Sequence, residues 1–324
     1  MILVTGGAGF IGSNLHAALV KRGERCVISD RLGTEGKWRN LQRHPPLRIV
    51  RPEALDAYLA TGPDISAVVH LGAISATTTN DGDLVWETNV ELSWRLWTWC
   101  AAHAVRFIYA SSASTYGDGA HGFDDDPALL TRLQPLNLYG WSKHAFDLRV
   151  AASIERGETA PPQWAGLKFF NVYGPNEYHK GPMISVVKRK YEEVAAGLPA
   201  RLFRSTHPGV PDGGQKRDFV WVGDVVDVIL WLLDHPEVTG LYNVGTGLAR
   251  SYLDLAHAVC AAAGRPPRVE FTPMPEALQA HYQNFTEARV TRLREAGYPG
   301  QFTPLEDGVR RYVQSYLAGP ELYV

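Results

Sequence analysis

A tyrosine and a lysine stand four residues apart, at Tyr139 and Lys143, in a stretch that predicts a helix over roughly 139–156. This spacing places both side chains on one helical face. A phenol has a pKa near ~10, and an adjacent ammonium group favours the phenolate and lowers that pKa. The pair could therefore transfer protons at neutral pH, although chance alone often produces this spacing.

Hydroxyl side chains crowd residues 111–115, directly after the apolar run 106–110, which predicts a strand. A serine at the carboxyl end of a parallel strand faces the ligand crevice of the sheet. Ser112 could therefore hold a substrate oxygen whose charge changes during a reaction. We expect Ser111, Ser114 and Thr115 to cap turns instead.

Three glycines follow the first apolar run of the chain, at Gly6, Gly9 and Gly12. Residues 2–4 predict a buried strand, and residues 11–22 predict a helix. Glycines between a strand and a helix allow a tight turn and a close approach of the backbone to a pyrophosphate at the helix N-terminus. The context therefore predicts a dinucleotide-binding loop.

Three charged residues after the second predicted strand bear on the choice of dinucleotide. Asp30, about 20 residues after the glycines, could accept hydrogen bonds from the ribose 2′-hydroxyl of NAD. Arg31 and Lys37 could instead hold the 2′-phosphate of NADP. The local signal is divided between the two cofactors.

Strand-like and helical segments alternate through the first half of the chain, which indicates a parallel sheet with helices on both faces. Glycine and proline become frequent after Asn171. We predict an α/β fold, a Rossmann-type doubly wound parallel sheet with a smaller C-terminal α/β substrate-binding region. The predicted dinucleotide-binding domain covers 1–170, with 219–245 returning to it, and the substrate-binding region covers 171–218 and 246–324. Further strands are predicted at 26–29, 67–71, 167–170, 219–222 and 241–244, and further helices at 83–100, 225–234 and 251–263.

Composition excludes several classes of function. The 324 residues carry 32 basic and 34 acidic side chains, so no basic excess is available for nucleic acid. The three cysteines lie far apart among apolar neighbours, which predicts buried free thiols in a reducing cytoplasm. The acidic run 124–126 predicts a solvated loop and no metal site. We find no export signal and no apolar run that could span a membrane.

Tryptophans gather in the predicted helix 83–100. Trp94 and Trp97 have i, i+3 spacing, which predicts packing in the core or between subunits. We also expect a homo-oligomer.

Together these motifs resemble the extended short-chain dehydrogenase/reductase superfamily, in particular its enzymes that modify nucleotide sugars. The resemblance runs nearly end to end. It rests on residues 5–12, 70–73 and 111–113, on Tyr139 with Lys143, and on residues 171–175 and 217–220.

A narrower resemblance is to the ADP-glycero-manno-heptose 6-epimerase family. It rests on 169–175, 179–183, 216–225 and 282–286, and the His-Lys-Gly run at 179–181 discriminates best. The resemblance implies an isomerase that oxidises the C6 alcohol of the heptose with tightly bound NADP and returns the hydride to the opposite face, in lipopolysaccharide core biosynthesis. The two epimeric alcohols present their O–H groups differently, so two proton-transfer groups are needed. By resemblance these are Tyr139 and Lys180, assisted by Ser112 and Lys143.

The resemblance also implies the remaining site residues. The cofactor would be bound by Gly6, Gly9, Phe10, Ile11, Gly12, Asp30, Arg31, Lys37, Leu71, Gly72, Ala73, Ile74, Ser75, Asn89, Lys143, Val172 and Lys180. The substrate would be bound by Ser112, Asn171, Pro182, Arg189, Phe203, Arg204, Arg217 and Tyr282. Arg217 would bind the diphosphate, an anion that suits a guanidinium fork.

The sequence leaves other functions open. The stretch 206–215 is longer than is usual in the family, and Pro182 and Arg189 replace its common residues, which leaves the exact sugar and nucleotide undetermined. The alternatives are a 4-epimerase or a net dehydrogenase of the same superfamily, or a dinucleotide sensor without catalysis. Ala113 and Ser114 stand where a dehydratase has a carboxylate pair, which argues against that reaction. The intact Ser112, Tyr139 and Lys143 argue against the sensor.

Overall fold

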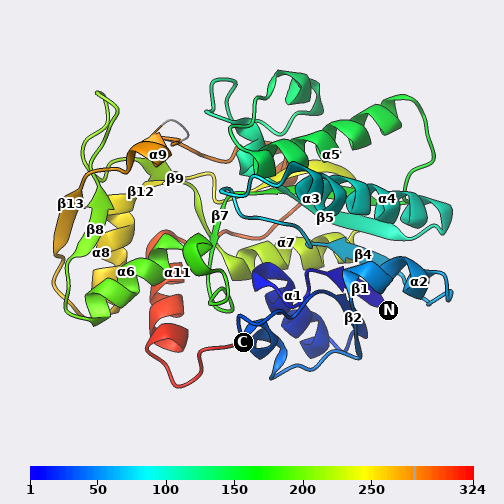
Figure 1. The fold of residues 1–324 in the computed structure, drawn as a ribbon, viewed down its shortest axis with the longest axis horizontal. Helices are drawn as coiled ribbons and strands as arrows, with labels where there is room; N and C mark the ends of the chain where they lie inside the picture. The colour runs from blue at the N-terminus through cyan, green and yellow to red at the C-terminus, as the bar shows by residue number, and fades with distance from the viewer. Residues whose placement is uncertain (280–281) are drawn as a thin grey trace.

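A central sheet of seven parallel strands organises the computed structural model, which describes residues 1–279 and 282–324 (Figure 1). The strand order is β11-β6-β5-β4-β1-β2-β3. Because the chain leaves β1 first toward β3 and then returns to β4 on its other side, the order reverses there and opens a crevice at the carboxyl ends of the strands. The predicted doubly wound α/β fold is confirmed. The strands are β1 Ile2–Thr5, β2 Cys26–Ser29, β3 Arg48–Val50, β4 Ala67–His70, β5 Arg106–Ser112, β6 Trp164–Phe169 and β11 Gly240–Val244.

Helices cover both faces of this sheet (Figure 1). The helices α1 (Phe10–Lys21) and α7 (Val222–Asp234) pack together on one face, where Leu15 and Ile229 are fully buried. The helices α4 (Leu92–Ala102) and α5 (Leu138–Glu155) cover the other face through residues such as Trp97 and Phe146. A short helix, α2 (Leu55–Leu59), precedes β4. The two apolar layers fix the sheet and thereby the crevice at its edge.

The predicted helix over 83–100 is not continuous. It divides into α3 (Gly82–Trp86), a π-helical turn over Glu87–Glu91, and α4. The wider turn contains Asn89, which is fully buried and whose side chain reaches the backbone of Ile74. Such turns inside helices often occur near functional sites.

A smaller region stands beside the sheet. Its strands pair two by two: β7 (Asn171–Tyr173) with β10 (Phe219–Trp221), β8 (Ala200–Phe203) with β13 (Val269–Thr272), and β9 (Lys216–Arg217) with β12 (Arg250–Ser251). The predicted strand at 219–222 therefore exists but pairs with β7 outside the main sheet, and only β11 of the returning segment joins that sheet. The helices are α6 Val186–Ala195, α8 Tyr252–Ala262, α9 Glu276–Gln279, α10 Thr291–Glu295 and α11 Leu305–Tyr312.

The last residues of the chain cross back from α11 toward the sheet, so the C-terminus lies near α1 and β2 (Figure 1). There they contact the loop 176–180. Tyr178 Oη donates to the carbonyl oxygen of Leu322 at 2.7 Å, and the backbone N–H of Val324 donates to Asn176 Oδ1 at 3.1 Å. A segment far away in sequence thus anchors this loop.

Cys26, Cys100 and Cys260 are buried and free, as predicted. No helix within residues 1–279 and 282–324 has the length and apolar character needed to cross a membrane. In the same part of the chain, no group of three or more His, Cys, Asp and Glu side chains could hold a metal ion.

Candidate active site

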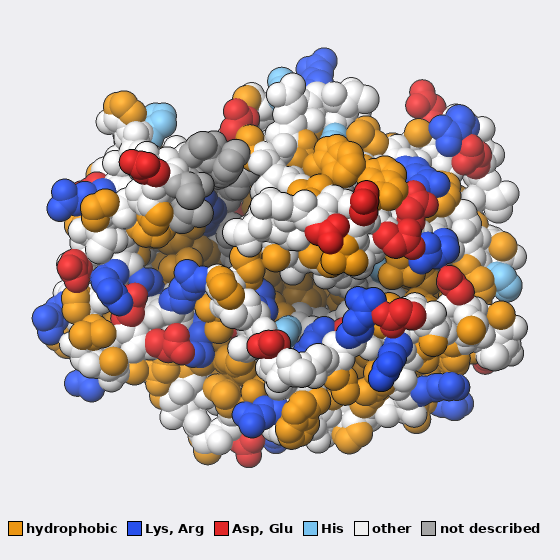
Figure 2. All heavy atoms as spheres, in the orientation of Figure 1, with side chains coloured by type: hydrophobic (Ala, Val, Ile, Leu, Met, Phe, Trp, Pro, Cys, Tyr) orange, Lys and Arg blue, Asp and Glu red, His pale blue; other side chains and the backbone are white. Residues whose placement is uncertain are grey.

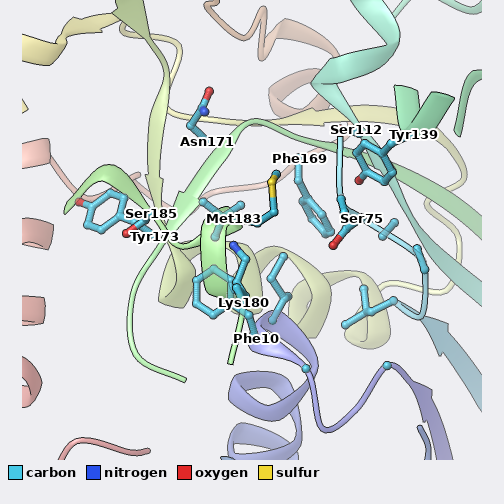
Figure 3. Close-up of a pocket in the computed structure, with 18 of the residues that line it drawn as sticks. Phe10, Ser75, Ser112, Tyr139, Phe169, Asn171, Tyr173, Lys180, Met183 and Ser185 are labelled. Carbon is cyan, nitrogen blue, oxygen red and sulfur yellow. The ribbon is translucent and has the colours of Figure 1, made fainter. Parts of the chain in front are cut away.

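A cleft of about 690 Å³ opens at the carboxyl ends of the central strands. The glycine loop and the segment after β4 form one part of its wall. Ser112, Tyr139 and Lys143 form a second part, and the segments 169–173 and 179–187 form a third. Figure 3 shows Tyr139 and Ser112 next to each other on one side of this pocket and Lys180 on another. The cleft therefore joins the sheet to the smaller region.

The glycine loop has the close approaches that a dinucleotide cradle requires. Gly6 has a φ of +66°, and a Cβ there would lie 2.7 Å from the backbone nitrogen of Gly72. A Cβ at Gly12 would lie 2.2 Å from the carbonyl oxygen of Gly6. The N-cap residue of α1, Gly9, makes no side-chain capping hydrogen bond, so N–H groups of the first turn face the cleft. These residues fit a bound pyrophosphate.

A second cavity of about 330 Å³ continues from the glycine loop past Asp30 to Arg31. Asp30 accepts hydrogen bonds from Lys37 Nζ at 2.5 Å and from the backbone N–H of Ala8 at 2.9 Å. Lys37 thus neutralises the carboxylate that would repel a 2′-phosphate. Arg31 forms an ion pair with Glu53, and 59% of its side chain is exposed. Its guanidinium can therefore turn toward a ligand in this cavity.

The residues after β4 line the cleft from Leu71 to Thr77. Asn89 holds this segment from behind. Its Oδ1 accepts from the backbone N–H of Ile74 at 2.8 Å, and its Nδ2 donates to the Ile74 carbonyl oxygen at 3.0 Å. Asn89 lies outside the residues that line either cavity, so it can act on a cofactor through Ile74.

Tyr139 stands in the first turn of α5 and hydrogen-bonds to the Ser112 hydroxyl. The start of α5 can approach the segment after β5 this closely because Gly140 has no Cβ. A Cβ there would lie 2.6 Å from the Ser114 carbonyl oxygen. The expected lowering of the Tyr139 pKa by Lys143 is not found. Burial raises the pKa of Tyr139, and the hydrogen bond from Ser112 only partly opposes this effect. The phenol is therefore in its protonated form and set to donate a proton.

Lys143 is buried beneath this site. Burial lowers the pKa of Lys143 to about 8, while the negative charge of Asp147 raises it. Asp147 is itself fully buried and accepts hydrogen bonds from Ser111 and Lys168, both at 2.6 Å. Ser111 therefore does not cap a turn as predicted, whereas Thr115 Oγ1 does bond to the carbonyl oxygen of Ser112.

Lys180 enters the cleft from the loop 176–185. Its Nζ lies 5.0 Å from the centre of the Phe10 ring, which opens α1, and 3.8 Å from Glu177 Oε2. Burial lowers the pKa of Lys180, and the charge of Glu177 partly offsets that effect. The cleft thus presents two proton-transfer groups, Tyr139 and Lys180, on different walls (Figure 3).

Comparison with known proteins agrees with this geometry. The profile of the NAD dependent epimerase/dehydratase family matches residues 2–245. The chain belongs to this family. The match begins at β1 and ends just after β11, so it spans every strand of the central sheet.

Two curated members of the epimerase/dehydratase family match this chain along its whole length. ADP-L-glycero-D-manno-heptose-6-epimerase from Nitratidesulfovibrio vulgaris is 48% identical over 328 residues and covers 100% of both chains. The enzyme of the same name from Fusobacterium nucleatum is 43% identical, again over 100% of both chains.

Solved structures of the family superpose closely on this fold. ADP-L-glycero-D-manno-heptose-6-epimerase from Helicobacter pylori has a TM-score of 0.79 at 26% identity, covering 96% of this chain and 94% of that one. UDP-glucose 4-epimerase from Thermus thermophilus, in complex with NAD, has a TM-score of 0.75 at 29% identity, covering 96% and 97%. Family members with different substrates thus share this architecture.

The predicted substrate residues fall into three groups. Ser112 and Asn171 line the cleft, whereas Arg217 and Tyr282 lie beyond its lining. Arg217 is buried between two rings, with its guanidinium carbon 5.1 Å from the centre of Tyr282 and 5.6 Å from that of Tyr252. The others are at the periphery: Pro182 accepts a hydrogen bond from Arg189, both are exposed, Phe203 is half-buried, and Arg204 is exposed.

Several cleft residues of this family member were missed by the sequence argument. They come mainly from the Lys180 loop and from the ends of neighbouring strands: Ala76, Thr77, Phe169, His179, Met183, Ile184 and Ser185. Figure 3 shows Met183 between Lys180 and Asn171. The signal available in the sequence was proximity, because four of these residues lie within five positions of Lys180 and Phe169 lies two positions before Asn171.

Replacing Arg31 by alanine is expected to weaken NADP binding about tenfold or more, and NAD binding much less. A charge-assisted hydrogen bond to the 2′-phosphate would be lost, and NAD has no such phosphate. Titration calorimetry with both cofactors measures the effect. Arg156→Ala is the matched control, because Arg156 pairs with Glu158 in a similarly exposed ion pair and lines neither cavity. Equal losses for both cofactors would remove Arg31 from this role.

Proposed function

We propose that the chain is an ADP-glycero-manno-heptose 6-epimerase that works with tightly bound NADP. The observation that carries the proposal is the placement of Tyr139 and Lys180 on different walls of one cleft (Figure 3). An enzyme that inverts an exocyclic alcohol must move protons to and from oxygens in two orientations. Full-length identity of 48% to an enzyme of that name supports the same substrate class.

The bound nicotinamide would accept and return the hydride at C6 of the sugar. Lys180, whose pKa is lowered by burial, would take the proton of the C6 hydroxyl as the C–H bond breaks, which leaves a 6-keto sugar. Ser112, beside the Tyr139 phenol, would hydrogen-bond to the carbonyl oxygen. The keto sugar would turn about its C5–C6 bond, and the second group would then donate a proton to the oxygen on the other side.

The residues of the glycine loop fit the pyrophosphate, and Leu71 to Ser75 with Val172 would border the remainder of the cofactor. We propose a preference for NADP over NAD, because Lys37 offsets the charge of Asp30 and the mostly exposed Arg31 could exchange Glu53 for a 2′-phosphate. We also propose a cytoplasmic location, where a biosynthetic enzyme of this type meets its nucleotide sugar.

We propose that residues 171–218 and 246–324 bind the nucleotide end of the substrate. Arg217 is the strongest candidate for the diphosphate, since Tyr252 and Tyr282 enclose its guanidinium and orient its fork. Burial raises the pKa of Tyr282, so this ring stays neutral beside the anion. Asn171 would contact the sugar where β7 meets the cleft.

The test uses purified protein and ADP-D-glycero-manno-heptose. Proton NMR of the product should show the L-glycero epimer at equilibrium with the starting sugar, without added cofactor. Denaturing the protein should release one NADP per chain. A requirement for added NADP with accumulation of NADPH would indicate a net dehydrogenase instead.

We further propose that the chain forms a homo-oligomer. Trp86 and Trp141 pack together with ring centres 5.4 Å apart and ring planes tilted by 34°, yet 37% and 45% of their surfaces are exposed. Hydrophobic side chains gather over α3 and α5, where these rings lie (Figure 2). Sedimentation velocity should give a species heavier than one chain, and Trp141→Ser should weaken the association. Sedimentation as a single chain at micromolar concentration would refute the proposal.

A further inference from the structure

Glu177 is a fully buried acid on the loop that carries Lys180. Its Oε2 accepts a hydrogen bond from the backbone N–H of Ser185 at 2.7 Å, and its Oε1 accepts one from Ser185 Oγ at 2.5 Å. Tyr312 Oη on α11 donates to the same Oε1 at 2.9 Å. Every one of these partners donates a hydrogen bond, which is the set that an ionised carboxylate requires. Burial raises the pKa of Glu177, and these bonds and the charge of Lys180 oppose that effect.

These bonds join three parts of the chain that carry the wall of the cleft. Ser185 is the N-cap residue of α6, and Tyr312 ends α11. The backbone N–H of Lys180 also donates to the carbonyl oxygen of Glu177 at 3.1 Å, so the two residues share one turn. The Glu177 side chain therefore closes the loop 177–185 onto itself and onto the distant helix. Loss of this closure would free the segment on which Lys180 stands.

We propose that Glu177 is the positioning residue for Lys180, which it holds in the cleft by anchoring the loop and by placing a buried negative charge 3.8 Å from the ammonium. This inference rests on the proposed function, since it assumes that Lys180 transfers a proton. Glu177 is fully buried and is not among the residues that line the cleft. It would therefore act on turnover through Lys180 alone.

The charges around Lys180 decide the direction of the expected pH effect. The groups that face it are Glu177 and His179 from its own loop, the Phe10 ring from α1, Lys37 and Asp30 beyond His179, and Tyr312 behind Glu177. Burial, with Lys37 and Lys180, lowers the pKa of His179 to about 4, so this ring is neutral near pH 7. Glu177 is then the group that raises the pKa of Lys180 against burial.

Replacing Glu177 by glutamine removes this charge and keeps the size of the side chain. The pKa of Lys180 should fall further, because burial is then unopposed. The limb of the kcat–pH profile that belongs to Lys180 should move to lower pH, whether Lys180 acts as acid or as base. We expect kcat at neutral pH to fall about tenfold to hundredfold through misplacement of the amine, with little change in KM.

A second measurement does not depend on activity. Nitrogen-15 NMR of lysine-labelled protein follows the titration of the Lys180 amine, assigned by its absence from Lys180→Met. The same downward movement should appear in Glu177→Gln. Tyr312→Phe is the matched control, since it removes one hydrogen bond to Glu177 but no charge, and its Lys180 titration should stay in place.

A Lys180 titration unaffected by Glu177→Gln, or moved equally by Tyr312→Phe, would overturn the inference and leave Glu177 a structural residue. Should the glutamine variant not fold, Glu177→Asp is used instead, because its shorter side chain moves the carboxylate away from Lys180 by one methylene. An unchanged Lys180 titration in that variant would also overturn the inference. Normal epimerisation by Lys180→Met would instead refute the role of Lys180 in the proposed function. The NMR titration distinguishes these two failures.

Discussion

Lys180→Met is expected to lose epimerisation by roughly 10²–10⁴-fold, the range typical of a missing proton-transfer group. Methionine is unbranched and apolar and keeps most of the length of the Lys180 side chain, so the wall of the cleft beside the Phe10 ring stays filled. The variant should nevertheless disproportionate an aldehyde analogue of the heptose, in which one molecule is oxidised to the acid and another reduced to the alcohol. That reaction needs no inversion, and Tyr139 remains available for it.

The measurements are epimer ratio by NMR and analogue turnover by chromatography. Lys188→Met on α6 is a matched control, because Lys188 pairs with Glu192 outside the cleft. Thermal denaturation checks that the unpaired Glu177 carboxylate has not unfolded the loop. Near-normal epimerisation by the Lys180 variant would make Lys180 a loop residue without a chemical role.

Tyr139→Phe should reduce kcat by a similar factor, roughly 10²–10⁴, and should bind NADP nearly as well as the unaltered protein. The phenylalanine ring retains the packing at the start of α5 but loses the hydroxyl that bonds to Ser112. The remaining Lys180 should support part of the opposite half-reaction with the aldehyde analogue. The two variants would then fail at inversion for complementary reasons.

Single-turnover reduction of the bound cofactor and steady-state kcat test this expectation. Tyr58→Phe on α2 serves as the control, since Tyr58 is not among the residues that line the cleft. An unchanged kcat in the Tyr139 variant would contradict the whole catalytic assignment, including the contribution of Ser112.

Local patterns were enough to predict the dinucleotide half of the molecule. Gly6 and Gly12 predicted the turn because the positive φ of Gly6 and the close approach of Gly12 to Gly6 involve neighbouring residues only. The strand that ends at Ser112 was likewise visible in a short apolar run. Burial was not predictable in this way. The pKa of Tyr139 depends on the walls that close around it, and those come from segments distant in sequence.

The other errors have the same origin. Glu177 was not singled out, because its importance depends on Tyr312, which is 135 residues away. The strand at 219–221 was predicted correctly as a strand. Its pairing with β7 could not be deduced, because the pattern of apolar residues in a strand does not say which strand lies beside it. Ser111 looked like a turn residue until the buried Asp147 provided an acceptor.

The crossing of the last residues onto the loop 176–180 has a consequence for the order in which the protein matures. Chains grow at about 5–20 residues per second, and the N-terminal parts fold first. The strands β1 to β6 are complete when Phe169 has emerged, and the anchors of the Lys180 loop at Tyr312, Leu322 and Val324 are made last. A nascent chain can therefore shape its dinucleotide cradle several seconds before its second proton-transfer group is held in place. Ribosome-bound intermediates would bind cofactor without turning over sugar.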